Sequence, residues 1–190
     1  MRIQLVVRDV PDCAVRSFTL EDAASIARHA NDARIARGLR DGFPHPYGID
    51  DARAYLGAVI GKEPETSYAI AVGGEVVGGI GVTLGDDVER YSAEIGYWLG
   101  VEHWGRGIAT AALAAMTEHA MRAFGLIRVF ALPMVSNPAS ARVLEKAGFV
   151  REGRLRASAV KAGAVEDQWM YAFVRAPASG RIDAAPKRNA

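Results

Sequence analysis

Short apolar runs bounded by turn residues predict a set of β-strands in the first half of the chain. The expected strands span residues 14–18, 67–72, 75–84 and 90–99. Gly73-Gly74 is a hairpin signal between the second and third strands, because glycine adopts the left-handed conformations that such turns need. A further turn at 85–87 follows the third strand. We therefore expect three successive antiparallel strands between residues 67 and 99.

Apolar residues spaced three and four apart predict two helices between these strands. The first begins after Thr19, where a hydroxyl is followed by acidic residues, and continues to about Arg37. The second begins at about Asp50, and its apolar face contains Leu56. The segment 42–48 between them is rich in proline and glycine, which predicts a loop.

The second half of the chain predicts a strand–helix–strand unit. A helix from about residue 107 to 124 separates the strand ending at Leu99 from a strand at 127–132. Such units pair their strands in parallel with a right-handed crossover.

Another helix and two closing strands follow this unit. Asn137-Pro138 is a typical helix start, Gly148 is a typical end, and segments 150–155 and 168–174 predict strands. The expected fold class is therefore α/β, with a mixed, mostly antiparallel sheet, one parallel strand–helix–strand crossover and flanking helices.

Length and composition limit the class of protein. The chain has 190 residues, 50% of them hydrophobic and 24% charged, with a formal net charge of +1. This balance is typical of a soluble globular domain and argues against nucleic-acid binding. The N-terminus lacks the apolar stretch of a signal peptide, and no apolar run approaches the roughly 20 residues of a membrane span. We expect one cytoplasmic domain over residues 1–175 and a flexible tail over 176–190, which is rich in alanine, proline and charge.

Cysteine and histidine usage gives no metal motif. Cys13 is the only cysteine, so an intramolecular disulfide and a cysteine-based zinc cluster are excluded. The histidines are far apart in the sequence, and none stands at a metal-ligand spacing with a carboxylate: they are His29, His45, His103 and His119. We therefore expect no metal, and we expect His103 and His119 on the surface.

The stretch HWGRGIATAALAAM, residues 103–116, places two glycines directly before a strong helix former. Glycine costs roughly 1 kcal/mol relative to alanine inside a helix, so Gly105 and Gly107 should lie at its edge. A glycine turn at a helix N-terminus can hold an anion, and Arg106 adds a cation, although a plain connecting turn is the alternative. The P-loop pattern is absent, and Thr110 stands where a dinucleotide-binding fingerprint needs its last glycine.

Three segments together resemble the GCN5-related N-acetyltransferase (GNAT) superfamily, within it the branch of ribosomal-protein N-terminal acetyltransferases (RimJ/RimL-like). They are AEIGYWLGVEHWGRGIATAAL, NPASARVLEKAGF and DGFPHPYGIDDA, at 93–113, 137–149 and 41–52. The likeness covers about residues 14–175. It implies transfer of an acetyl group from acetyl-coenzyme A to a primary amine, either a protein N-terminus or a small amine. Relatives are monomers or dimers, so a homodimer is one expectation, and no nucleic-acid or membrane partner is expected.

The resemblance also implies a coenzyme site. The family's pyrophosphate turn, Q/R-x-x-G-x-G/A, matches residues 104–109, with tryptophan at the first position. The preceding strand is expected to separate from its neighbour, so that the pantetheine arm pairs with it as a peptide would. The implied coenzyme-binding residues are Gly96, Tyr97, Trp98, Leu99, Trp104, Gly105, Arg106, Gly107, Ile108, Ala109, Thr110 and Asn137. Tyr97 and Trp98 also fit a core position, and Asn137 also fits a helix cap.

The implied transfer needs a base, because an amine with a pKa near ~10 is mostly protonated at neutral pH. Glu94 is the candidate, since a carboxylate within a strand is costly unless water or a partner reaches it. We expect it to act through a water molecule, and a merely solvated glutamate is the alternative. The backbone N–H groups of residues 96–99 are the expected donors to the carbonyl oxygen.

The leaving thiolate needs an acid. Many relatives carry a tyrosine seven residues after the asparagine that begins the last helix, and here that position is Leu144. Ser140, in the first turn of the same helix, is the substitute, and ordinary helix capping is its alternative role. His45 and Tyr47, in the loop 42–48, are candidates for the acceptor mouth, although a surface position is the stronger expectation for His45.

Two functions remain after this reading. The first is an acetyl-coenzyme-A-dependent N-acetyltransferase. The second is a catalytically silent sensor or scaffold that binds the coenzyme without turnover. Leu144 favours the second, whereas Glu94 and Ser140 favour the first. The hypothesis of a dinucleotide-binding protein is supported by the incomplete glycine pattern alone.

Overall fold

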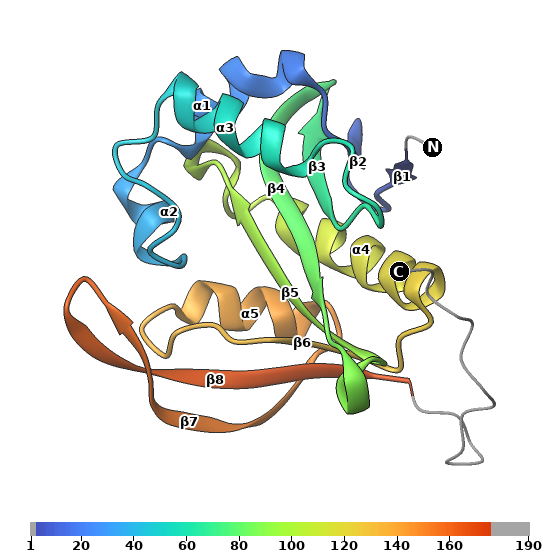
Figure 1. Ribbon diagram of the computed structural model, residues 1–190, viewed down its shortest axis with the longest axis vertical. Coiled ribbons are helices and arrows are strands. Elements are labelled where there is room, and N and C mark those ends of the chain that lie inside the picture. Colours follow the sequence, from blue (N-terminus) through green and yellow to red (C-terminus); the bar gives the residue numbers. More distant parts are fainter. Residues whose placement is uncertain (1–2, 176–190) are drawn as a thin grey trace.

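The computed structural model describes residues 3–175, which form an eight-stranded sheet with helices on both faces (Figure 1). The strand order is β1-β2-β3-β4-β5-β6-β8-β7. Every neighbouring pair is antiparallel except β5 and β6, which are parallel. The expected α/β class, with one parallel crossover in a mostly antiparallel sheet, is confirmed.

The strands agree with the sequence pattern in the middle of the chain and differ at its ends. They are β1 (Gln4–Val6), β2 (Cys13–Ser17), β3 (Ser67–Val72), β4 (Glu75–Leu84), β5 (Ser92–Leu99), β6 (Arg128–Ala131), β7 (Val150–Lys161) and β8 (Ala164–Val174). The sequence reasoning missed β1, which pairs with β2 at the sheet edge. The hairpin β7–β8 is longer than expected, because its outer part extends beyond the core and has few buried positions to set a pattern (Figure 1).

The helices are α1 (Ala23–Ala30), α2 (Ala33–Arg37), α3 (Ile49–Val59), α4 (Ile108–Phe124) and α5 (Pro138–Lys146), with short 3-10 turns at Leu20–Asp22, Asp87–Glu89 and Val101–His103. The single helix expected over 19–37 is wrong, because Asn31 and Asp32 interrupt it. The Asp32 carboxylate accepts a hydrogen bond from the backbone N–H of Arg34 and caps α2. The Asn31 amide oxygen accepts one from the backbone N–H of Tyr47. Such short polar side chains compete with the helical backbone.

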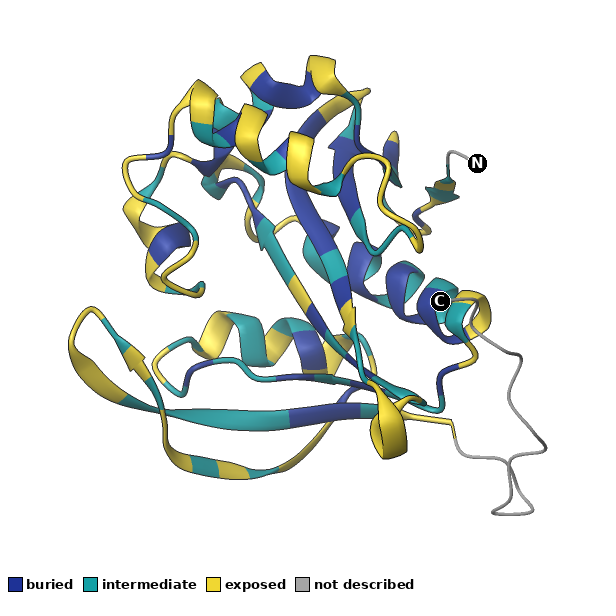
Figure 2. Ribbon diagram, viewed as in Figure 1, coloured by how far each residue is buried: buried dark blue, intermediate teal, exposed yellow. Residues whose placement is uncertain are grey.

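Each face of the sheet has its own hydrophobic core (Figure 2). Helices α1 and α3 pack on one face and α4 on the other. Strand β5 contributes to both cores, since Ala93 and Ile95 face α4 whereas Trp98 packs against the core under α1 and α3. The expected alternation along this strand is confirmed, and it puts Glu94 on the same face as Trp98.

Strands β5 and β6 pair over three positions only, Ser92–Glu94 with Arg128–Phe130. Beyond Glu94, β5 continues along β4 to Leu99, whereas β6 follows β8. Figure 1 shows the two strands meeting at one end and diverging toward the other. The expected separation is confirmed, and within the described part of the chain the last residues of β5 have a strand neighbour on one side only.

The tail expected at 176–190 lies outside the described residues. Within residues 3–175, no helix has both the length and the apolar character needed to cross a membrane. Cys13 is buried in β2 as a free thiol.

Candidate active site

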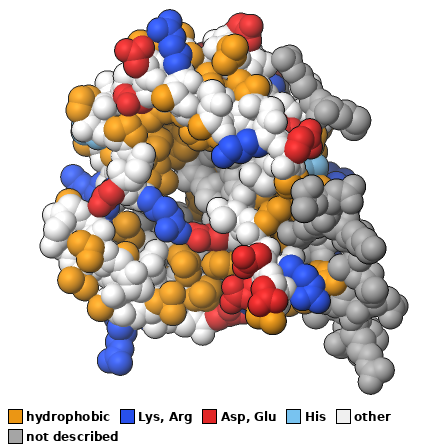
Figure 3. All heavy atoms as spheres, viewed as in Figure 1, with side chains coloured by type: hydrophobic (Ala, Val, Ile, Leu, Met, Phe, Trp, Pro, Cys, Tyr) orange, Lys and Arg blue, Asp and Glu red, His pale blue; other side chains and the backbone are white. Residues whose placement is uncertain are grey.

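A cavity of about 1650 Å³ opens where β5 leaves β6, bordered by β1, α2, the turn before α4, and α5. Figure 3 shows this face of the molecule hollowed between the upper helices and the lower hairpin layer, with Lys and Arg side chains at the rim. Cations that line the cavity include Arg34, Arg37 and Lys146. The predicted site residues that line it are Tyr97, Trp98, Leu99, Trp104, Gly105, Arg106, Gly107, Ile108, Ala109, Thr110, Asn137 and Ser140.

The turn before α4 points backbone donors into this cavity. Gly105 and Gly107 have φ angles of +73° and +78°, a region that residues with a Cβ rarely adopt. Gly107 caps α4 without a side chain, so the first N–H groups of the helix, beginning at Ile108, have no intrahelical acceptor. The positive end of the helix dipole lies at the same place. The arrangement suits an anion such as a pyrophosphate, and the position of the glycines before the helix is confirmed.

Trp104 ties the turn to the end of β5. Its indole Nε1 donates a hydrogen bond to the carbonyl oxygen of Leu99 at 2.8 Å. Its backbone N–H donates to the carbonyl of Val101 at 3.1 Å. Tryptophan at the first position of the turn therefore braces the loop against the end of β5.

Glu94 and Gly96 border a different space. They line a pocket of about 540 Å³ together with Arg40, Ser67 and Thr83, and they do not line the large cavity. The Glu94 carboxylate accepts hydrogen bonds from Nη2 of Arg40 at 2.7 and 2.9 Å, and its side chain is 28% exposed. Both a cation and solvent therefore reach this carboxylate. Sequence reasoning missed Arg40, because it lies 54 residues away in the loop after α2 and belongs to no local motif.

Tyr97 lies on the opposite face of β5 and reaches the start of α5. Its hydroxyl is 2.9 Å from Oγ of Ser140 and 3.3 Å from the Ser140 carbonyl oxygen. The Asn137 side chain accepts from the backbone N–H of Ser140 at 3.1 Å, so its role as helix cap is confirmed. Burial raises the pKa of Tyr97 to about 12, against the lowering effect of its hydrogen bond to Ser140. The phenol therefore keeps its proton at neutral pH.

The Tyr97–Ser140 contact supplies a phenol to a helix that lacks one of its own. Leu144, where many relatives carry a tyrosine, is fully buried in the core between the sheet and α5. Sequence reasoning placed Tyr97 in the coenzyme site or the core but missed its contact with Ser140. Strand alternation and helix periodicity cannot relate two residues that are 43 positions apart.

The loop 42–48 is held against the body of the molecule. Phe43 contacts both Tyr47 and Trp98, with ring centroids 4.9 and 5.9 Å apart. Tyr47 is buried under α1 and α3, so its expected place at an acceptor mouth is wrong. Next to the loop, Nζ of Lys161 contacts the Asp41 carboxylate at 2.7 Å, which joins the β7–β8 hairpin to this region.

The two histidines expected on the surface are both half-buried. His103 packs edge-on against the buried His29, with ring centroids 5.1 Å apart. His119 packs in the same way against Tyr68 at 5.7 Å. The prediction of a surface position was based on the polarity of the neighbouring residues, which gives no information about aromatic contacts with residues distant in sequence.

Comparison with known proteins gives one consistent family. A family model described as "Acetyltransferase (GNAT) domain" matches residues 13–150. An uncharacterized N-acetyltransferase p20 of Bacillus licheniformis is 26% identical over 172 residues, which cover 87% of this chain and 94% of that protein. The ribosomal-protein-serine acetyltransferase of Escherichia coli (strain K12) is 37% identical over 83 residues, covering 44% of this chain and 46% of the relative.

A solved structure matches the whole described fold. The structure of Mycobacterium smegmatis RimJ in complex with CoA-disulfide superposes with a TM-score of 0.78 at 26% identity. The match covers 91% of this chain and 86% of RimJ.

Proposed function

The chain belongs to the GNAT acetyltransferase family and is an acetyl-coenzyme-A-dependent N-acetyltransferase, and on this basis we propose that it acetylates a primary amine. The free N-terminus of a protein is the leading acceptor class in this proposal. The name of one relative, a ribosomal-protein-serine acetyltransferase, supports a protein acceptor. A small amine remains the alternative within the same chemistry.

The large cavity fits the coenzyme. Acetyl-coenzyme A supplies an acetyl thioester, and its pyrophosphate suits the N–H groups between Gly105 and Thr110 and the nearby Arg106. The edge of β5 at residues 97–99, which has no strand partner on the β6 side within residues 3–175, suits an extended pantetheine arm. Asn137 borders the same cavity at the start of α5.

Glu94 acts as the base on the acceptor side. The acceptor reaches its pocket as an ammonium ion at neutral pH and must lose a proton before it can attack. A carboxylate that is 28% exposed can take this proton through a water molecule. Arg40 holds both carboxylate oxygens from one side, so it orients Glu94 and is the cation that an incoming ammonium ion meets first.

Ser140 and Tyr97 act on the thiol side. The departing sulfur needs a proton, and the Ser140 hydroxyl lines the cavity beside the last residues of β5. Tyr97 contacts that hydroxyl at 2.9 Å and, with its pKa raised to about 12 by burial, keeps a proton to pass on. Ser140 is thus the acid that touches the substrate, and Tyr97 positions and reprotonates it.

One observation carries this proposal. Glu94 and Tyr97 lie on opposite faces of β5, close to where it separates from β6, and the Tyr97 hydroxyl contacts Ser140 of α5. An amine can therefore approach from one face while a thiol leaves on the other. A protein that only bound the coenzyme would need the large cavity but not the carboxylate pocket behind it.

The test combines binding and turnover. Thermal unfolding is measured with acetyl-coenzyme A, with NAD as a control, because a ligand at about 100 times its Kd stabilises by roughly 2.7 kcal/mol. Thiol release is then followed with peptides that carry a free α-amine, the same peptides with a blocked α-amine, and small amines. We expect a shift with acetyl-coenzyme A alone and turnover that needs the free α-amine. Binding without turnover on any amine would favour the sensor or scaffold.

A further inference from the structure

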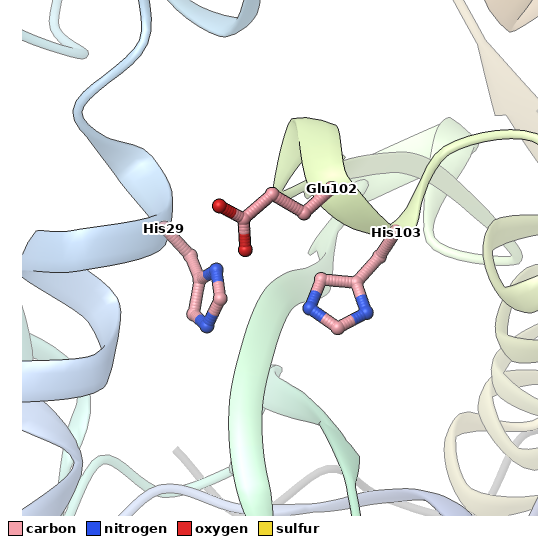
Figure 4. A group of neighbouring side chains, drawn as sticks. All are labelled: His29, Glu102 and His103. Atoms are coloured by element: carbon pink, nitrogen blue, oxygen red, sulfur yellow. The ribbon is translucent and has the colours of Figure 1, made fainter.

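Two histidines and a glutamate that the proposed transfer does not use meet beside the turn before α4 (Figure 4). His29 comes from α1, whereas Glu102 and His103 come from the 3-10 turn Val101–His103. One ligand atom from each side chain lies within 4.8 Å of the other two. We propose that His29, Glu102 and His103 bind one divalent transition-metal ion of the zinc class.

The donor set has the chemistry of a zinc site. Two imidazole nitrogens and a carboxylate oxygen, with water at the fourth position, are a common zinc coordination. Ligand atoms 2.0–2.2 Å from a tetrahedral ion lie roughly 3.3–3.6 Å from one another, so binding needs these atoms to close by about 1.5 Å at most. Glu102 is exposed, and its carboxylate has no hydrogen-bond partner within residues 3–175, so it can make this movement.

His29 is already oriented as a ligand. Its side chain is 4% exposed, and its Nε2 faces Oε1 of Glu75 at 3.1 Å. Nη2 of Arg28, which pairs with Glu75, lies 3.1 Å from the same Nε2. A metal ion at Nδ1 selects the tautomer that carries a hydrogen on Nε2, in which the ring donates to Glu75. Figure 4 shows a ring nitrogen of His29 facing the Glu102 carboxylate. A carboxylate behind the ligating histidine is the usual outer partner of a metal-bound imidazole.

The charges around the cluster favour a metal that binds imidazole strongly. Arg28 pairs with Glu75, and Nη1 of Arg106 lies 3.4 Å from Nδ1 of His103, which leaves Nε2 of that ring for a ligand bond. Arg28 thus balances Glu75, and Arg106 adds a positive charge beside His103. A hard cation such as Mg²⁺, which depends on carboxylate charge, gains little here, whereas Zn²⁺ or Ni²⁺ gains two imidazole bonds.

The test measures metal binding directly and does not depend on acetyl transfer. The full chain, without an affinity tag and stripped with a chelator, is titrated with Zn²⁺ by calorimetry, with Mg²⁺ as the comparison ion. We expect one Zn²⁺ per chain, a rise in Tm with Zn²⁺, and no response to Mg²⁺. Absence of Zn²⁺ binding to the wild-type chain would overturn the proposal.

Variants assign the site. His103→Ala and Glu102→Gln should each weaken Zn²⁺ binding at least tenfold, and Glu75→Gln, which removes the outer partner, should weaken it about 10–100-fold. His45→Ala removes an exposed histidine of the loop 42–48 and should leave Zn²⁺ binding unchanged. Circular dichroism checks that each variant is folded. Wild-type affinity in folded His103→Ala and Glu102→Gln would mean that the ion binds elsewhere, which would refute the site.

Discussion

The proposed coenzyme side and the proposed acceptor side of this site are built in different ways. The coenzyme side comes mainly from one continuous stretch, the end of β5 with the turn and first residues of α4. The acceptor side comes from four separate segments, which supply Arg40, Ser67, Thr83 and Glu94. The proposed coenzyme contacts are mostly backbone N–H groups, whereas those to the acceptor are side chains.

Because of this difference, a substitution on one side should have a different effect from a substitution on the other. A backbone cradle tolerates most changes of side chain and fails only when the backbone conformation changes. A pocket made of side chains loses its chemistry when a single functional group is removed, although the fold persists. Substitutions in the two regions should therefore affect binding and turnover separately.

Glu94→Gln should give the largest effect. It removes the base but keeps the shape, so kcat should fall by about 10²–10⁴-fold with the Kd for acetyl-coenzyme A unchanged. Steady-state thiol release and calorimetric binding measure the two quantities. Glu89→Gln, at an exposed glutamate just before β5, should change neither. Comparable kcat values for Glu94→Gln and wild type would show that the carboxylate has no part in the reaction.

Ser140→Ala and Tyr97→Phe test the other face of β5. Each should lower kcat by roughly 10–100-fold, the lower part of the range for general acid–base catalysis, with coenzyme binding largely kept. Because the two hydroxyls are 2.9 Å apart, the double variant should lose little more than the worse single variant. Fully additive losses in kcat would mean that the two groups act independently.

Gly107→Ala should affect the coenzyme side alone. An added Cβ at Gly107 meets nothing within 4 Å, so the cost comes from its φ of +78° and not from a clash. A left-handed residue with a Cβ costs roughly 1–2 kcal/mol, which predicts a Kd for acetyl-coenzyme A about 5–30-fold weaker. Gly57→Ala, in α3 with open space and an ordinary φ, is the matched control. Unchanged affinity in Gly107→Ala would argue that the turn does not contact the coenzyme.

Arg40→Gln should give the smallest effect. The Arg40 side chain is 79% exposed, and exposed ion pairs contribute about 0–1 kcal/mol. We expect a severalfold lower KM for a protonated amine, because a competing cation is gone, and a severalfold lower kcat, because Glu94 is less well oriented. Arg40→Lys keeps the charge and should restore the wild-type KM. An effect on KM for acetyl-coenzyme A in place of the amine would contradict this assignment.

The sequence alone determined the elements whose signals are local. These elements depend on neighbouring residues, whose steric and hydrogen-bonding preferences act without the rest of the fold. They are the ranges of β3 and β4, the start of α4 after two glycines, the Asn137 cap and the alternation along β5. The turn proposed to bind the pyrophosphate belongs to this group because its donors are backbone N–H groups.

The tertiary structure alone decided the contacts between distant segments. It joined Asn31 to the backbone of Tyr47, paired Arg40 with Glu94, and set Tyr97 beside Ser140. It also brought together His29 and His103, which are far apart in the sequence. These contacts follow from how sheet and helices pack, and a period of 2 or 3.6 residues carries no information about which distant side chains will meet.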